Sequence, residues 1–198
     1  MNILLTGFGA FLNNDENPTE EIMKIFPISI YGNKVIKLVL PVDFNNAFDQ
    51  VKEAIDEFKP EIIINFGLAR GRKAITPERV AINVNDSKQS DNVGNAPQDE
   101  TINPNGLSAY FTKLPLKKIV EKLNQKSIPV SISNTAGTYV CNNIMYRVLE
   151  YIDQIDLDAV AGFVHVPLMT EQKHNDDEFT LPLNTILEGV IDIVKCCL

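Results

Sequence analysis

The sequence predicts an α/β fold: a single-domain, three-layer α/β/α sandwich around a mostly parallel, twisted sheet. Residues 62–67 and 158–167 are apolar on both faces, which is typical of buried parallel strands. Segments with a helical period lie between the strand-like segments, so the first third of the chain reads β-α-β-α-β. A chain of 198 residues suits one domain, and we expect residues 1–198 to form one.

The first third of the chain sets this alternation. Residues 2–6 form an apolar run that ends at Gly7 and predicts a first strand. Asn17 and Pro18 are typical cap and first-turn residues of a helix. The side chains of that helix that we expect to face inward are Ile22, Ile25 and Phe26. Residues 35–42 predict a second strand, and Asp43 is the expected cap of a helix that Pro60 terminates.

The middle of the chain breaks the rhythm. Residues 77–85 have a period of two, which predicts an extended segment with Val80, Ile82 and Val84 on one buried face. Glu78 has the same parity, and a carboxylate on an apolar face needs a partner. Two interpretations stay open: an ion pair with a local arginine, from the polar loop that holds Arg70 and Arg72, or a contact that orients a histidine. Residues 86–106 form a long polar loop, which we interpret as a flap beside a site.

The rest of the chain returns to helices and strands. Pro115 begins a helix, residues 130–133 predict a strand, and Thr138 is the expected cap of the next helix. Residues 158–167 predict a further strand that Pro167 ends. A loop over residues 168–180 leads to the last helix, which we expect to begin near Thr180 and Pro182.

Cys141 falls in the first turn of the helix after Thr138. The free N–H groups and the positive dipole end of a helix favour a thiolate, so this position predicts a lowered thiol pKa and a reactive cysteine. A free cysteine is also among the most buried residue types and often packs as a small apolar side chain. The stretch by itself leaves both interpretations open.

The histidines and the overall composition limit the chemistry. His165 ends an apolar strand and could be either a core residue or a base, whereas His174 lies among polar residues and is expected to be solvated. No ligand spacing typical of a metal site occurs, so we expect no metal. The net charge of −8 argues against nucleic-acid binding, and no apolar run is long enough for a membrane span. The N-terminus lacks a secretory pattern, and three cysteines suit a reducing cytoplasm better than a disulfide framework.

The three ambiguous residues have related places in the predicted fold. Ligands bind open α/β sheets beyond the carboxyl ends of the strands. His165 ends a strand, Cys141 follows one, and Glu78 begins an extended stretch that could reach across. A cysteine, a histidine and a carboxylate are the parts of a thiol nucleophile system, in which the histidine takes the thiol proton and the carboxylate orients the imidazole. Covalent acyl transfer is therefore the expected reaction class.

At these residues the chain resembles the pyroglutamyl peptidases, also called pyrrolidone carboxyl peptidases. The similarity covers nearly the whole chain and includes four motifs in order: T-G-F with Phe11 and N-P near the N-terminus, P-E-R-V-A-I-N around Glu78, N-T-A-G-T-Y-V-C-N ending beyond Cys141, and F-V-H-V-P around His165. The resemblance implies that Cys141 is the nucleophile, His165 the general base and then acid, and Glu78 the orienting carboxylate.

The reaction that the resemblance implies is removal of an N-terminal pyroglutamyl residue from a peptide, with no cofactor and no metal. A pyroglutamyl lactam has no ammonium group, so an apolar slot with a few hydrogen bonds can bind it. By resemblance, the residues of this slot are Phe8, Phe11, Asn17, Leu68, Tyr139 and Val140. The family also implies a homo-oligomer, such as a tetramer.

The chain departs from the family pattern in three places. Lys88 stands in a site-lining loop where an arginine is usual, and a lysine cannot form a planar bidentate fork. Leu68 replaces a glutamine, so one lactam hydrogen bond is expected to be missing or supplied by the backbone. Ala10, Leu12 and Asn13 replace a proline and two glycines, which changes the expected shape of the pocket.

Two other functions compete with the peptidase. The first is a non-catalytic binding or assembly module on the same scaffold, with Cys141 buried and inert. The second is a nucleotide-binding oxidoreductase, suggested by Gly7 and Gly9, which Leu12 disfavours because it stands where the fingerprint needs a third glycine.

Overall fold

The computed structural model describes residues 1–11, 16–173 and 175–198. The expectations for His174, Leu12 and Asn13 therefore lie outside the described residues. Within the described part of the chain, no helix is both long and apolar enough to cross a membrane.

The main sheet has six strands in the order β2-β3-β1-β4-β8-β5. Their bounds are β1 Asn2–Phe8, β2 Ser29–Ile30, β3 Asn33–Leu40, β4 Ile62–Leu68, β5 Thr76–Pro77 and β8 Val160–Val166. The four central strands, β3, β1, β4 and β8, are parallel, and the short edge strands β2 and β5 are antiparallel to their neighbours. The predicted mostly parallel sheet is confirmed.

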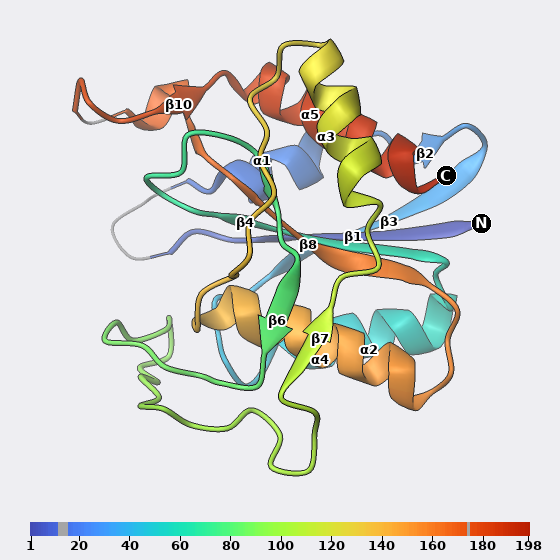
Figure 1. The fold of residues 1–198 in the computed structure, drawn as a ribbon, viewed down its shortest axis with the longest axis vertical. Helices are drawn as coiled ribbons and strands as arrows, with labels where there is room; N and C mark the ends of the chain where they lie inside the picture. Colours follow the sequence, from blue (N-terminus) through green and yellow to red (C-terminus); the bar gives the residue numbers. More distant parts are fainter. Residues whose placement is uncertain (12–15, 174) are drawn as a thin grey trace.

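Helices cover both faces of this sheet (Figure 1). Their bounds are α1 Pro18–Ile25, α2 Ala47–Phe58, α3 Leu116–Gln125, α4 Val140–Gln154 and α5 Leu183–Cys197. One apolar core lies between the sheet and α1, α3 and α5, and a second lies between the sheet and α2 and α4. The three-layer α/β/α sandwich is therefore confirmed.

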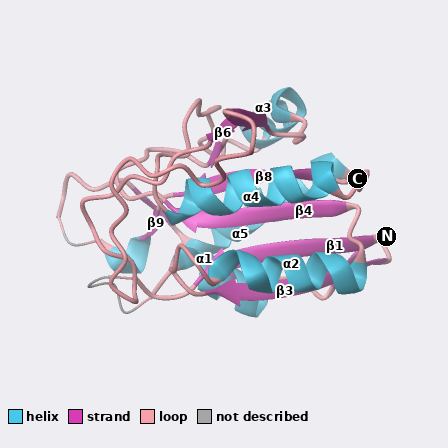
Figure 2. Ribbon diagram, turned by 90° about the horizontal axis from the view of Figure 1, so that it is seen from below, coloured by secondary structure: helices cyan, strands magenta, loops and turns pink. Residues whose placement is uncertain are grey.

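Three small elements extend the loops. Strand β6, Val80–Ile82, pairs with β7, Ala109–Phe111, as an antiparallel ribbon beside α4. Strand β9, Leu168–Met169, pairs with β10, Thr180–Leu181, and a short 3-10 helix, Thr170–Gln172, follows β9. Figure 2 shows most of the long loops beyond one end of the sheet, the end at which the parallel strands finish.

Of three predicted helix caps, one is confirmed and two are wrong. The confirmed cap is Asn17 of α1, whose side chain accepts a hydrogen bond from Thr19 N–H. Asp43, by contrast, accepts the N–H groups of a preceding turn, and α2 begins later, after Asn46. Thr138 does not cap α4; its hydroxyl donates to the Asp86 carbonyl, and Tyr139 is the cap. In both cases the polar side chain binds a neighbouring turn or loop instead of the first turn of the helix.

The predicted buried face of residues 77–85 is wrong. Ala81 is fully buried, whereas Ile82, of opposite parity, is 36% exposed. The chain leaves the main sheet after Pro77 and pairs again only in the ribbon of β6 and β7, so one alternation does not run through the whole segment. Ile25 was also expected to face inward and is 47% exposed at the end of α1.

Residues 130–133 do not form a strand of the sheet. They make isolated parallel bridges, Ile75 with Val130 and Glu78 with Ser133, alongside the edge strand β5. Pro77 has no N–H to donate, so the ladder cannot continue regularly past it. The segment nevertheless leads into the helix of Cys141, as expected, and the structure places it next to Glu78.

Candidate active site

The three predicted catalytic residues come from adjacent parts of the sheet's carboxyl end. His165 lies in β8, where its neighbours in register are Gly67 of β4 and Thr76 of β5. Glu78 follows β5 directly, and its N–H donates to the Phe163 carbonyl of β8. Cys141 is the second residue of α4. Parallel pairing and the short edge strand therefore bring residues that are distant in sequence to one place.

Glu78 contacts the histidine and an arginine at the same time. His165 Nδ1 lies 2.7 Å from Glu78 Oε1, and Arg72 Nη1 lies 2.7 Å from the same oxygen. Both interpretations of Glu78 left open by the sequence are thus correct. The Glu78 side chain is fully buried, and its Oε2 has no hydrogen-bond partner in the described part of the protein. The geometry fixes the imidazole with Nδ1 toward the carboxylate and leaves Nε2 for another partner.

Cys141 lies against the strand that neighbours His165. A Cβ built on Gly67 would be 3.0 Å from Cys141 Sγ and 2.8 Å from Phe163 Cζ. The Phe163 ring in turn packs against His165, with 4.8 Å between ring centroids. Only a residue without a side chain fits between the sulfur and the β8 side chains, so Gly67 allows the close approach of α4 to the sheet.

Burial dominates the protonation of this group. It raises the pKa of Cys141 to about 12, and the nearby Glu78 carboxylate adds to the increase. Burial also lowers the pKa of His165, although the bond to Glu78 opposes this, and Arg72 lowers it further. The expected lowering of the Cys141 pKa is therefore wrong: removal from water outweighs the favourable helix start. At neutral pH the thiol and the imidazole are both uncharged.

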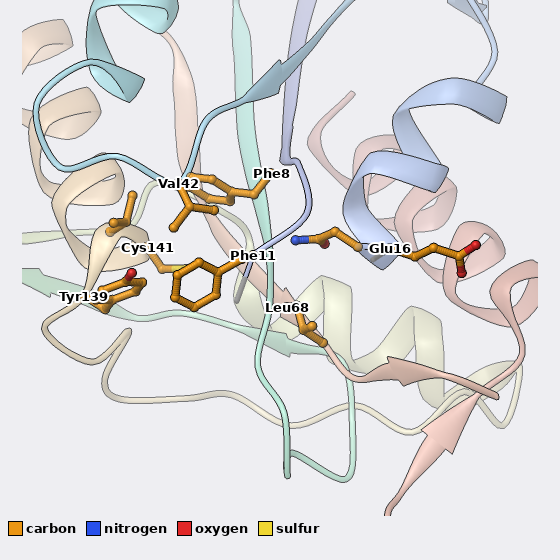
Figure 3. A pocket seen from close by; sticks show the side chains of 9 residues that line it. Phe8, Phe11, Glu16, Val42, Leu68, Tyr139 and Cys141 are labelled. Atoms are coloured by element: carbon orange, nitrogen blue, oxygen red, sulfur yellow. The ribbon is translucent and has the colours of Figure 1, made fainter. Parts of the chain in front are cut away.

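A pocket of about 90 Å³ opens above the thiol (Figure 3). Its lining residues are Phe8, Phe11, Glu16, Asn17, Val42, Leu68, Tyr139, Val140 and Cys141. The rings form a continuous wall, because Tyr139 packs against both Phe11, at 5.3 Å, and Phe44, at 5.1 Å between centroids. An apolar pocket next to a nucleophile suits a small uncharged group.

The structure places six of the seven predicted substrate-binding residues in this lining. The exception is Lys88, which is exposed and is not among the lining residues. Asn17 reaches the pocket, but its side chain already bonds Thr19 N–H and the Gly9 carbonyl. It therefore holds the first loop to α1, and within the described residues a second amide hydrogen has no hydrogen-bond acceptor.

Sequence reasoning missed two lining residues. Val42 follows β3, and its position beyond the end of a central strand is the signal that could have identified it. Glu16 immediately precedes the cap of α1, and Figure 3 shows its carboxylate pointing away from the aromatic side chains. No pattern in the sequence distinguishes Glu16 from other exposed acids.

The loop over residues 86–106 lies beside the pocket, as the flap interpretation expects. The Tyr139 hydroxyl donates to the Ser90 carbonyl, and Asn92 N–H donates to the Val42 carbonyl. Asp91 accepts N–H groups from Phe44 and from its own loop. These bonds attach the flap to the aromatic wall.

Among the described residues, no group of three or more histidine, cysteine or acidic side chains could hold a metal.

Comparison with known proteins points to one family. A sequence model of the pyroglutamyl peptidase family matches residues 1–197. A pyrrolidone-carboxylate peptidase of Clostridium perfringens is 42% identical over 191 residues, which span 96% of this chain and 90% of that protein. The corresponding protein of Oceanobacillus iheyensis is 50% identical over 166 residues, 83% of each chain.

Solved structures agree with these sequence relatives. A mutant pyrrolidone carboxyl peptidase from Pyrococcus furiosus superimposes with a TM-score of 0.96 at 38% identity and covers 100% of this chain and 98% of its own. Pyroglutamyl peptidase I from Bacillus amyloliquefaciens gives a TM-score of 0.95 at 37% identity, covering 100% and 95%. The similarity thus extends over the sheet, the helices and the site.

Proposed function

The chain belongs to the pyroglutamyl peptidase family, whose reaction removes an N-terminal pyroglutamyl residue from a peptide, and we propose that Cys141, His165 and Glu78 carry out this reaction here. The observation that carries the assignment is the 2.7 Å contact of His165 Nδ1 with a fully buried Glu78, beside a pocket that Cys141 lines. The contact leaves the second imidazole nitrogen to serve the thiol.

The first half of the reaction forms a thioester. As Cys141 Sγ bonds to the pyroglutamyl carbonyl carbon, the thiol proton passes to His165 Nε2. Because burial keeps the thiol protonated at neutral pH, this transfer accompanies the attack and is not completed beforehand. The first N–H groups of α4 have no partners within the helix and can donate to the developing oxyanion.

Collapse of the tetrahedral intermediate completes this first half. The His165 imidazolium gives its proton to the leaving amine as the C–N bond breaks, and the shortened peptide departs from the thioester. The second half regenerates the enzyme: a water molecule attacks the thioester, His165 accepts its proton and passes it to the Cys141 sulfur, and pyroglutamate leaves. Glu78 stabilises the imidazolium in both steps through its bond to Nδ1.

The aromatic pocket is the proposed lactam slot. Phe8, Phe11, Leu68 and Val140 supply apolar surface, and Tyr139 joins the slot to the flap. A peptide with a free amino terminus would have to desolvate an ammonium group against these rings, which disfavours its binding. Lys88 is exposed on the flap, so it would contact the substrate only after the flap closes over the pocket.

Turnover of a fluorogenic pyroglutamyl amide, compared with the same amide of proline, tests the function. We expect kcat/KM to be at least about 100-fold higher for the pyroglutamyl amide, since only proline carries a charge into the slot. Cys141→Ala should abolish turnover and leave the circular dichroism spectrum unchanged.

Chemical labelling of Cys141, combined with the turnover assay, separates an enzyme from a binding module. Iodoacetamide should label Cys141 once per chain, and 2-pyrrolidone should protect it. Labelling that 2-pyrrolidone blocks, together with turnover, would favour the enzyme. Absence of both labelling and turnover would favour the non-catalytic module with its inert Cys141, and turnover by Cys141→Ala would exclude the proposed nucleophile.

We also propose that residues 1–198 act as one domain, in a reducing cytoplasm, as a homo-oligomer such as a tetramer. Support for the compartment comes from three free cysteines, and the net charge of −8 disfavours nucleic-acid and anionic membrane partners. Sedimentation equilibrium tests the assembly, and a purely monomeric protein at micromolar concentration would contradict it.

A further inference from the structure

Arg72 joins three segments of the catalytic centre. It lies between β4 and β5, and its Nη1 is 2.7 Å from Glu78 Oε1 and 2.6 Å from Thr76 Oγ1. Its Nη2 donates to the Thr135 carbonyl at 3.0 Å, in the turn that leads to Cys141. We propose that Arg72 is a positioning residue, which holds Glu78 against His165 and holds the turn before the nucleophile; the inference rests on the proposed function.

Glu78 needs a cation that His165 does not supply at rest. The Glu78 side chain is fully buried, and a buried carboxylate is strongly unfavourable without an opposite charge. The bond to a neutral imidazole adds no such charge. Within the described residues, Arg72 is the permanently charged group in contact with Glu78, so it supplies the opposite charge and fixes the carboxylate in place.

The bond to Thr135 extends this role to the nucleophile. The backbone already ties the two segments together, because Ser133 N–H donates to the Pro77 carbonyl and Arg79 N–H to the Ser133 carbonyl. Arg72 adds a side-chain tie just before Gly137, whose positive φ of 79° turns the chain toward α4. A planar guanidinium can bond Glu78 and Thr135 together, whereas a lysine ammonium on a single flexible stem holds this geometry poorly.

The charge of Arg72 also sets the strength of the base. Among the described residues, the charged groups that act on His165 are Glu78, after β5, and Arg72, before β5, while its neighbour in register on β4 is Gly67. Arg72 lowers the pKa of His165, and Glu78 raises it. Without Arg72 the uncompensated carboxylate would favour the imidazolium, so the base would become neutral only at higher pH.

Direct titration of His165 tests this inference. The chain has only two histidines, so a His174→Gln variant assigns the two imidazole NMR signals. In Arg72→Gln we expect the His165 pKa to rise by about one pH unit, and the acid limb of kcat/KM to move by the same amount. We expect kcat to fall about tenfold, with KM within about twofold, because Arg72 does not line the pocket.

Two further variants separate charge from geometry. Arg72→Lys keeps the charge, so the His165 pKa should stay near its wild-type value while kcat still falls, because the Thr135 bond is lost. Arg70→Gln is the matched control, since this arginine lies in the same loop but pairs with Glu178 at an exposed position. Its His165 pKa and kcat should equal those of the wild type.

Specific results would overturn the proposal. A folded Arg72→Gln with an unchanged His165 pKa would remove the electrostatic role, and wild-type kcat in Arg72→Lys would remove the positioning role. The Lys variant keeps the test valid if the Gln variant does not fold. Should wild-type protein fail to hydrolyse pyroglutamyl amides while the His165 pKa still shifts as expected, the proposed function would fail and the electrostatic role of Arg72 would stand.

Discussion

At the scale of single residues, Glu78 has two partners for one oxygen. Its Oε1 lies 2.7 Å from both His165 and Arg72, so the carboxylate is fixed from two sides. The bond to Nδ1 selects the tautomer that leaves Nε2 able to accept a proton. In the proposed mechanism this nitrogen is the base for the Cys141 thiol, whose ionisation burial opposes.

Glu78→Gln tests the selection of the tautomer. A glutamine carries no charge to stabilise the imidazolium, and its amide can turn its NH₂ group toward Nδ1 in place of the single oxygen that now meets both His165 and Arg72, which permits the unproductive tautomer. We expect kcat to fall by about 10³- to 10⁴-fold with little change in KM, as measured with the pyroglutamyl amide. The matched control is Glu188→Gln, an exposed carboxylate that pairs with Lys126 and should leave kcat unchanged. An unaltered kcat in Glu78→Gln would make Glu78 purely structural.

At the scale of elements, the site depends on how closely α4 approaches β4 and β8. The side chain of Asn142, next to Cys141, accepts from Ile82 N–H and donates to the Ile82 and Val84 carbonyls. These bonds attach the ribbon of β6 and β7 to the start of α4. On the opposite side, Gly67 leaves room for the sulfur and for the Phe163 ring. The helix start is thus fixed between a ribbon and a strand.

Gly67→Ala tests the close approach of this helix and strand. The added methyl would lie 2.8 Å from Phe163 Cζ and 3.0 Å from Cys141 Sγ, so the ring or the helix start must move. We expect kcat/KM to fall about 10- to 100-fold and the free energy of unfolding to decrease by about 1–3 kcal/mol.

Gly9→Ala is the control for this change. A Cβ there would meet its nearest atom, from Val39, at 3.7 Å, which is an ordinary contact distance. Both kcat/KM and the free energy of unfolding should therefore stay near the wild-type values. Full activity in Gly67→Ala would show that the site tolerates displacement of α4 or of Phe163.

At the scale of the whole molecule, the buried histidine links stability to pH. Burial lowers the folded-state pKa of His165 below the unfolded value of 6.5, so the unfolded chain binds more protons between those two pH values. The contribution of this group to stability is therefore complete above pH 6.5 and is lost as the pH falls toward the folded-state pKa. Because this group binds one proton, it can change the free energy of unfolding by at most about 1.4 kcal/mol per pH unit.

Denaturant unfolding at pH 7.5 and at pH 5.5 tests this linkage. The wild type should lose more stability over this interval than His165→Asn, which has no imidazole to protonate. The Asp91 and Asp56 carboxylates, whose pKa values lie below 3.8, change little in this range. Equal losses in the two proteins would mean that the folded state accepts the His165 proton without cost.

The sequence alone determined the layers and the catalytic candidates. Apolar runs at β4 and β8 and the helical periods between strands are local patterns, and they identified a mostly parallel sheet covered on both faces. The motifs around Glu78, Cys141 and His165 were equally local. Their places at the expected ends of strands and at a helix start predicted that they converge, and the structure brings Glu78 and His165 into contact.

Only the tertiary structure decided how these residues are joined. Three features depend on segments remote in sequence: the contact of both Arg72 and His165 with the Glu78 carboxylate, the exposure of Cys141, and the covered face of residues 77–85. Side-chain pairing and desolvation arise from the neighbours that packing brings together, and one-dimensional periodicity does not encode those neighbours. For the same reason the thiol pKa, raised by burial, opposed the expectation from the helix start.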